Sequence, residues 1–304
     1  METGDKGSVS IGKVVVVGGQ SRAAIAFRRL VAKAQPFPLT VLVRRPDQAL
    51  PGEQVVVVKD YFSPPDDVLA GASAIVNFAG IPDDRPEAEL FAVNVRGPER
   101  LAQKARACGI KHMVQISSLH IYGAPTRVDR STKEAPLSTY ARSKLAGDVA
   151  LSALQTADFR ITLLRMPMHY GPDAGKKLRM LVGLAARLGW FPVPKTPVRR
   201  SMVHLDNLAT AILTVLRRGL DGVQFVADPE LFGYEVLRDA LRLHTGRTIR
   251  LIRLPDVFFL LIRVFANGAY RRLYQDNVIA PELVLQPESG YPVTLVAGLK
   301  DVMP

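Results

Sequence analysis

Short apolar runs, each followed by small or polar residues, recur through the first half of the chain. They are Lys13–Val17, Leu39–Val43, Gln54–Lys59, Ser73–Phe78 and Lys111–Ile116. Short runs rich in valine and isoleucine are typical of strands that are buried on both faces of a parallel sheet. Longer helix-like stretches lie between them, for example from about Glu87 to Cys108. The pattern therefore predicts an α/β fold with a doubly wound parallel sheet.

A glycine-rich turn connects the first predicted strand to an apolar helix that ends near Ala34. It reads Gly18-Gly19-Gln20-Ser21-Arg22-Ala23-Ala24. A strand, a glycine turn and a helix start form an anion-binding corner, because free backbone N–H groups and the helix dipole face a pyrophosphate. Ser21 replaces the second glycine of the usual pattern and Ala24 the third, so the motif is incomplete. The candidate cofactor-binding residues here are Gly18, Gln20, Ser21 and Arg22.

Two arginines, Arg44 and Arg45, follow the second predicted strand. A carboxylate at this place would hold the ribose 2′-hydroxyl of NAD, whereas guanidinium groups suit a 2′-phosphate. The alternative is that both arginines are simply solvated. We favour the first interpretation and expect NADP(H) rather than NAD(H).

Further candidate cofactor contacts stand at or just after the ends of the later strands. Asp60 is placed to meet the adenine, and small residues follow the fourth strand, where a cofactor ribose would lie against the sheet. In open α/β sheets, ligands bind at the carboxyl ends of the strands. These candidates are Asp60, Tyr61, Phe78, Ala79, Gly80 and Pro167, and Asn94 of the predicted helix from Glu87 to Cys108 joins them.

The chemistry centres on Tyr140 and Lys144, which are four residues apart. On a helix this spacing puts both side chains on one face. An ammonium beside a phenol stabilises the phenolate, which gives a group able to exchange a proton with a hydroxyl or carbonyl. Ser118, at the end of the fifth predicted strand, can hydrogen-bond the same oxygen. A Tyr-x-x-x-Lys pair also occurs by chance on an ordinary amphipathic helix. The surrounding motifs therefore decide whether this pair is interpreted as catalytic.

Those motifs together resemble the extended short-chain dehydrogenase/reductases, in the branch of nucleotide-sugar epimerases, dehydratases and ketoreductases. The resemblance runs from about Lys13 to the C-terminus. It rests on the glycine corner, Asn77-Phe78-Ala79-Gly80, Asn94-x-x-Gly97, Ser117-Ser118, Ile121-Tyr122-Gly123, Tyr140-x-x-x-Lys144, Leu164–Pro172 and Arg200–Ala209. It implies a Rossmann-type sheet and a catalytic set of Ser118, Tyr140 and Lys144, the last two also binding the cofactor.

The resemblance also implies a substrate side in the second half of the chain. It places Arg200 against the diphosphate of a nucleotide sugar, where a guanidinium fork fits. Lys177 is a plausible helper or a solvated charge. Met168 stands where many epimerases and dehydratases have an asparagine that contacts the sugar nucleotide. The candidate substrate-binding residues are Arg200, Lys177, Met168 and His120, and no metal site is expected.

Two departures from the family narrow the expected activity. Leu119-His120 replaces the acidic pair of the dehydratases, and Arg44-Arg45 replaces the carboxylate of the NAD-retaining epimerases. The remaining motifs resemble most those of bacterial 4-ketoreductases, which reduce UDP-4-keto-6-deoxy-N-acetylhexosamines for surface polysaccharides. We therefore expect an NADP(H)-dependent reductase of a 4-keto nucleotide sugar. The alternatives are a 4-epimerase with bound NAD and a non-catalytic nucleotide-binding or assembly protein, which the incomplete glycine turn would suit.

The second half of the chain predicts a second, smaller lobe. Strands are expected at Arg160–Leu164, Val223–Val226 and Thr248–Arg253, and helices at Lys176–Leu188 and Tyr234–His244. We expect a flexible N-terminus over residues 1–12, a dinucleotide-binding domain over 13–165 and an α/β substrate-binding lobe over 166–304. Because no stretch has the composition of a linker, the two should be interleaved.

Composition changes this picture only in part. The 304 residues include one cysteine, Cys108, and Met1–Gly12 is too polar for a signal peptide, so we expect a cytoplasmic protein. The net charge of +12 fits an anionic partner, whether nucleic acid, a membrane surface or a phosphorylated small molecule, or else a solvated basic surface. We expect a nucleotide sugar and no nucleic acid.

The segment over residues 255–274 combines phenylalanines and aliphatic residues with arginines. A basic helix with exposed aromatic residues could lie on an anionic membrane. The sequence favours the other interpretation, in which the helix packs on the substrate lobe or on a neighbouring subunit of a homodimer.

Overall fold

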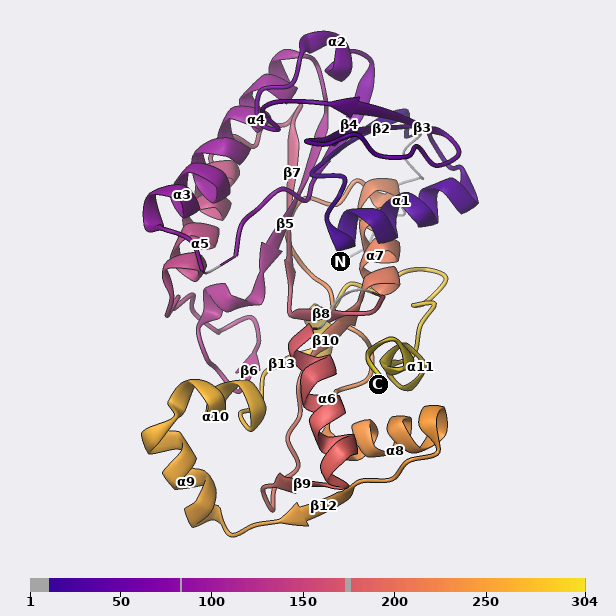
Figure 1. Cartoon of the computed structure of the whole chain (residues 1–304). Helices are drawn as coiled ribbons and strands as arrows, with labels where there is room; N and C mark the ends of the chain where they lie inside the picture. The colour runs from indigo at the N-terminus through magenta and orange to yellow at the C-terminus, as the bar shows by residue number, and fades with distance from the viewer. Residues whose placement is uncertain (1–10, 83, 173–175, 304) are drawn as a thin grey trace, which may run out of the picture.

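The computed structural model describes residues 11–82, 84–172 and 176–303 (Figure 1). Its centre is a seven-stranded sheet with the order β11-β7-β5-β4-β1-β2-β3, in which every neighbouring pair is parallel. The strands are β1 (Lys13–Val17), β2 (Leu39–Val43), β3 (Glu53–Val57), β4 (Ala72–Asn77), β5 (His112–Ser118), β7 (Arg160–Met166) and β11 (Gly222–Phe225). The predicted doubly wound Rossmann-type sheet is confirmed.

Helices cover both faces of this sheet (Figure 1). On one face lie α1 (Arg22–Ala34) and α7 (Leu205–Arg218), whose apolar sides share a core with the valines of β1 and β2. The helices on the other face are α3 (Glu87–Phe91), α4 (Gly97–Ala107) and α5 (Thr139–Ser152), and the short α2 (Asp66–Leu69) lies between β3 and β4. The strands are apolar on both sides because both sides are covered.

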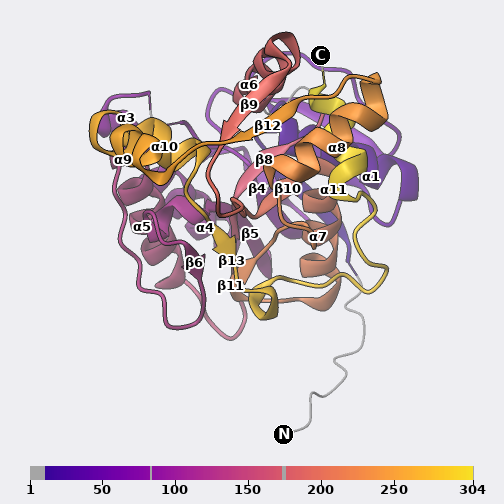
Figure 2. The same cartoon turned by 90° about the horizontal axis from the view of Figure 1, so that it is seen from below.

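The smaller lobe is built around α6 (Lys176–Leu188) and α8 (Tyr234–Thr245), which enclose a separate apolar core (Figures 1 and 2). Its other helices are α9 (Asp256–Phe265), α10 (Asn267–Leu273) and α11 (Leu295–Gly298). The two-stranded pairs are β8 (Met168–Tyr170) with β10 (Met202–His204), β9 (Trp190–Val193) with β12 (Arg250–Arg253), and β6 (Arg127–Val128) with β13 (Val278–Ile279).

Between these excursions the chain returns to the large sheet through α7 and β11. The smaller lobe and the sheet are thus built from alternating stretches of sequence. Residues 1–10 of the expected flexible N-terminus lie outside the described residues. Across the described ranges, no helix is both long and apolar enough to cross a membrane.

The structure departs from the predicted elements in two informative places. The stretch from Glu87 to Cys108 is interrupted by a π-helical turn, η1 (Ala92–Arg96), between α3 and α4. Strand β5 extends to Ser118, two residues beyond the predicted end, because Ser117 and Ser118 continue the ladder with Arg165 and Met166 of β7. Both serines are therefore held by the sheet itself.

Candidate active site

The glycine turn lies where the order of the sheet reverses between β1 and β4, which is the place where open α/β sheets bind ligands. Gly18 has φ +76°, and a Cβ on it would lie 2.8 Å from the backbone nitrogen of Ala79. A Cβ on Gly19 would lie 2.2 Å from Val41 Cγ1. These close approaches leave room only for glycine, so the turn has the shape that a bound dinucleotide requires.

Ser21, at the second glycine position, caps helix α1 by accepting a hydrogen bond from Ala24 N at 3.2 Å. Its hydroxyl hydrogen remains able to donate to a phosphate. Arg22 is the first residue of α1, whose first turn carries no acidic residue. The corner is thus positive, as an anion site requires.

Arg44 and Arg45 are exposed and extend from the end of β2. The guanidinium of Arg44 lies 5.0 Å from the centre of the Tyr61 ring, which is a cation–π contact. Gln20 donates from its side chain to the carbonyl of Arg45 at 3.2 Å, which connects this loop to the glycine turn. Four of the predicted contacts, Gln20, Arg44, Arg45 and Tyr61, therefore lie in one cluster.

A buried arginine that the sequence analysis missed supports this cluster. Arg28 of α1 is 3% exposed and donates to Asp47, Glu53 and the carbonyl of Gly19, at 2.7 Å, 2.9 Å and 3.0 Å. The hydrogen bond from Arg28 is the main cause that lowers the pKa of the Asp47 carboxyl group. One side chain thus fixes the glycine turn and the loop after β2 relative to each other.

Asp60 already has partners, because it pairs with Arg100 at 2.8 Å and accepts from Phe62 N at 2.9 Å. Each carboxylate oxygen thus contacts one partner, Oδ1 the Phe62 N–H and Oδ2 the Arg100 guanidinium. The predicted contact of Asp60 with adenine stays a prediction.

Hydrogen bonds connect the end of β4 with β5 and with the residues that follow β4. Asn77 donates to Gln115 of β5 at 2.8 Å and accepts from Ala79 N at 3.0 Å. Asn94 stands in the π-helical turn η1, is 3% exposed and donates to Ser143 of α5 at 3.0 Å. A π-helical turn often accompanies a functional site. Here it presents Asn94 to the helix that carries Tyr140 and Lys144.

The three catalytic candidates lie on β5 and α5. Ser118 ends β5 and accepts from His120 N at 3.2 Å, which caps the 3₁₀ turn η2 (Leu119–Tyr122). The His120 ring is edge-on to the Tyr140 ring with 6.2 Å between their centres. Lys144 is 6% exposed and donates to the carbonyl of Ile116 at 2.7 Å. Turn η2 therefore connects the serine end of β5 with the tyrosine of α5.

Beneath them lies a buried ion pair that the sequence analysis did not identify. Arg165 of β7 donates to Asp148 of α5 at 3.0 Å, and both side chains are 4% exposed or less. Ser117 donates to the same carboxylate at 2.7 Å, and Arg165 also contacts Tyr122 and Glu134. Burial lowers the pKa of the Lys144 ammonium, and the Asp148 charge opposes this shift. Asp148 lies four residues after Lys144, a signal that was present in the sequence.

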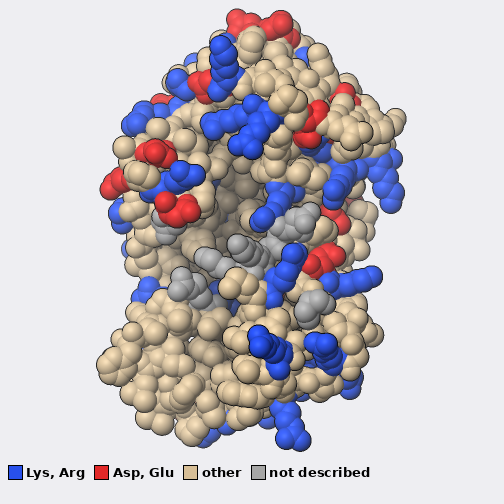
Figure 3. All heavy atoms as spheres, in the orientation of Figure 1, with Lys and Arg blue, Asp and Glu red and all other residues tan. Residues whose placement is uncertain are grey.

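The predicted substrate side lies across the crevice in the smaller lobe. Figure 3 shows the surface hollowed between the two halves of the molecule. Met168 of β8 is 41% exposed, and Pro167 beside it is buried. The backbone of Arg200 bonds with Phe232 in both directions, and burial lowers the pKa of its guanidinium. The side chain of Lys177 lies outside the described part of the structure.

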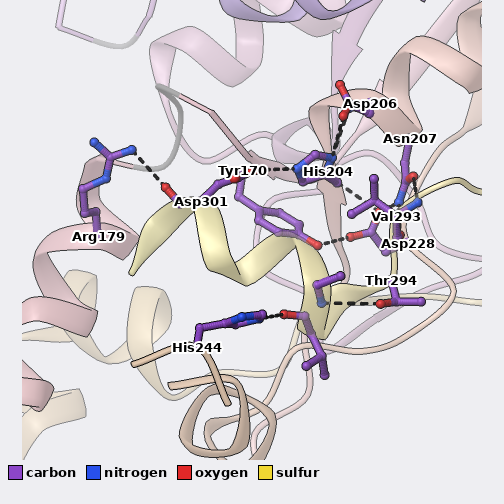
Figure 4. A network of polar contacts seen from close by, with 12 residues as sticks. Tyr170, Arg179, His204, Asp206, Asn207, Asp228, His244, Val293, Thr294 and Asp301 are labelled. Atoms are coloured by element: carbon purple, nitrogen blue, oxygen red, sulfur yellow. Dashed lines mark hydrogen bonds and ion pairs between the residues drawn. The ribbon is translucent and has the colours of Figure 1, made fainter. Parts of the chain in front are cut away.

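A second buried polar network connects the strands of the smaller lobe to the C-terminal segment (Figure 4). The carboxylate of Asp228 accepts from Tyr170 and Asn207, each at 2.7 Å, and from His204 N at 3.0 Å. The His204 ring contacts Asp301 at 3.0 Å and accepts from Asp206 N at the start of α7, so it connects this helix with the C-terminal segment. In the described ranges, no three His, Cys, Asp or Glu side chains gather to hold a metal ion.

Known proteins resemble this chain in sequence and in fold. The sequence profile described as "NAD dependent epimerase/dehydratase family" matches residues 60–227. The ceramide reductase of Caulobacter vibrioides is 33% identical over 194 residues, 63% of this chain and 56% of that protein. The dTDP-4-dehydrorhamnose reductase of Mycobacterium tuberculosis is 30% identical over 166 residues, 51% of this chain and 53% of that protein. The chain thus spans little more than half of either relative.

Among solved structures, a UDP-glucuronic acid 4-epimerase from Bacillus cereus in complex with NAD superposes with a TM-score of 0.72. The match covers 95% of this chain and 96% of that one at 14% identity. At this identity the similarity establishes the fold alone.

The packing of α5 on η1 generates a test of the site's geometry. A Cβ on Gly147 would lie 2.2 Å from the carbonyl oxygen of Asn94, whereas a Cβ on Gly183 of α6 would meet nothing within 4 Å. Gly147→Ala should destabilise the protein by about 1–3 kcal/mol, as overpacking does. Gly183→Ala should stabilise it by about 0.5–1 kcal/mol, because alanine is the better helix residue. Urea unfolding of both variants measures the difference, and equal stabilities would refute this contact.

Proposed function

Because the chain belongs to the NAD dependent epimerase/dehydratase family, we propose that it is an NADP(H)-dependent reductase of a ketone. The observation that carries the proposal is the placement of Ser118, Tyr140 and Lys144 around η2 and the end of β5. When bound in the crevice, a reduced nicotinamide supplies a hydride. The two relatives described above are both named reductases, which supports reduction over epimerisation.

The side chains of this chain would then complete the reduction. Tyr140 gives its proton to the carbonyl oxygen as the hydride reaches the carbonyl carbon, so that the ketone becomes an alcohol. The Ser118 oxygen already accepts from His120 N, so its hydrogen is available to the same carbonyl oxygen. Lys144 supplies a buried positive charge that donates to the Ile116 carbonyl and is favoured by the charge of Asp148.

The preference for NADP(H) rests on Arg44 and Arg45. Both are exposed at the end of β2, on the loop that Arg28 holds against the glycine turn. A 2′-phosphate next to two guanidinium groups forms charge-assisted hydrogen bonds that a 2′-hydroxyl cannot match.

For the substrate we propose a 4-keto nucleotide sugar of the UDP-4-keto-6-deoxy-N-acetylhexosamine type. Arg200 supports this choice, because burial disfavours its charge and the negative charges of a diphosphate would favour it. The reductase from M. tuberculosis is named for a 4-dehydro nucleotide sugar, which is the same kind of compound.

A second candidate substrate is a ketone on a long-chain lipid amide. The relative from C. vibrioides is named a ceramide reductase and has the higher identity of the two relatives. Met168 agrees with this candidate, since it presents an exposed thioether where sugar-nucleotide enzymes of the family place a polar amide. Turnover measured with both compounds separates the two.

Replacing the proton donor tests the reduction itself. Tyr140→Phe should lower turnover by a factor of about 10²–10⁴, the range for removing a general acid, and leave NADPH affinity nearly unchanged. Tyr270→Phe, in α10, is the matched control and should keep full turnover. The reductase proposal fails if Tyr140→Phe retains wild-type turnover on the true substrate.

Calorimetric titration tests the cofactor preference. NADPH should bind at least about tenfold more tightly than NADH, and Arg44→Ala or Arg45→Ala should each cost about 1.5–3 kcal/mol with NADPH only. Arg106→Ala, on the exposed end of α4, should change neither affinity. Equal affinities, or a protein that retains NAD tightly and gains nothing from NADPH, would favour the epimerase alternative.

UDP binding tests the nucleotide-sugar substrate without knowledge of the sugar. Arg200→Ala should weaken UDP binding by about 2–5 kcal/mol and spare NADPH, because it removes one partner of a buried charge pair. Arg200→Lys should recover only part of the loss. The exposed neighbour Arg199 is the control, and Arg199→Ala should bind UDP normally. If the wild-type protein does not bind UDP, the nucleotide-sugar substrate is refuted and the lipid ketone is favoured.

A further inference from the structure

Helix α9 is attached to the smaller lobe by one side only. Phe259 is 4% exposed, and its ring packs edge-on against Tyr274 with 4.9 Å between ring centres. Ile262, one turn later, packs on the same core. The sequence predicts that this helix packs on the lobe or on a neighbouring subunit. Among the described residues, Phe259 and Ile262 are the two of α9 that join the lobe core.

The opposite side of α9 is apolar and exposed. Val257, Val264 and Phe265 are 62%, 65% and 83% exposed. The full set, called here the outer face of α9, is Val257, Phe258, Leu260, Leu261, Val264 and Phe265. Soluble proteins rarely leave large side chains of this kind together at the surface unless something covers them.

Exposed arginines lie on the same segment of the chain as this outer face. Between Arg247 and Gln275 the sequence contains six arginines and a single acidic residue, Asp256. The exposed ones on α9, on α10 and just before α9, called here the arginine collar, are Arg253, Arg263 and Arg271. Among the described residues, no ion pair involves a member of the collar. Figure 3 shows the region of α9 and α10 as mostly uncharged surface, with Lys and Arg at the lower edge of the lobe.

We propose that the outer face of α9 docks into the interface of an anionic lipid bilayer. A helix of ten residues is about 15 Å long, which is too short to span a bilayer, so α9 would lie in the plane of the membrane. Its apolar side chains would enter the boundary between headgroups and acyl chains. The arginine collar would meet the anionic headgroups, whose attraction adds to apolar burial.

The collar distinguishes a membrane from a second copy of the chain. In a two-fold dimer formed through α9, the same patch would face itself, and the two collars would be brought together. Like charges that face each other across an interface disfavour it. An anionic surface instead neutralises the arginines of the collar. The proposal does not depend on which ketone the enzyme reduces.

Co-sedimentation with vesicles tests the docking. We expect the wild type to bind vesicles of phosphatidylcholine with 30% phosphatidylglycerol at least about tenfold more tightly than vesicles of phosphatidylcholine alone, and less tightly as salt rises. The double variant Val264→Ser/Phe265→Ser should lose at least about tenfold in affinity. Leu243→Ser, at an equally exposed leucine of α8, is the matched control and should bind like the wild type.

Two further measurements make the outcome decisive. Arg253→Gln/Arg263→Gln should reduce binding to the anionic vesicles and remove most of its salt dependence. All variants should keep wild-type NADPH affinity, which shows that they are folded. Vesicle binding that is unaffected by Val264→Ser/Phe265→Ser would overturn the proposal. So would a dimer, seen by light scattering without lipid, that this variant dissociates.

Discussion

The candidate active site depends on one buried ion pair, Asp148 with Arg165. Its two charges lie 3.0 Å apart in a part of the molecule from which water is excluded. Each charge there is compensated chiefly by the charges around it, and removal of either one would leave the other with fewer opposite charges in a buried place. Since Asp148 belongs to α5 and Arg165 to β7, the pair determines how the helix sits on the sheet. Ser117 and Tyr122 contact the same two residues, so β5 and η2 are fixed with them.

This arrangement explains how a site formed by different elements keeps its geometry. Tyr140 and Lys144 are carried by α5, whereas Ser118 is carried by β5, and hydrogen bonds between the elements hold both. The close contact of Gly147 with Asn94 fixes the same helix from its other side. A second set of contacts around Arg28 fixes the glycine turn in a similar way. In both places a buried charged side chain holds together backbone from different elements.

Much of the sheet could be predicted from sequence, because a strand buried on both faces leaves an unmistakable run of valines. Strands β1 and β2 begin and end where the pattern predicts. The π-helical turn η1 could not be predicted, since it reflects packing against α5 rather than local preference. The very short strands of the smaller lobe also leave no periodic signal. The ion pair of Asp148 with Arg165 joins a helix to a strand, so the sequence did not predict it. The sequence showed only that Asp148 lies one helical turn after Lys144.

The contacts of Asp228 have a consequence for the order in which the molecule is made. Its partners come from two stretches, Tyr170 from β8 and His204 with Asn207 from the junction of β10 and α7, and Asn207 in turn bonds with Val293, 86 residues further along the chain. During synthesis, N-terminal parts generally fold first. The large sheet can close once β11 has left the ribosome, but the smaller lobe lacks its last partners until residues 293–301 have been synthesised. The cofactor crevice should therefore form on the nascent chain well before the wall opposite it.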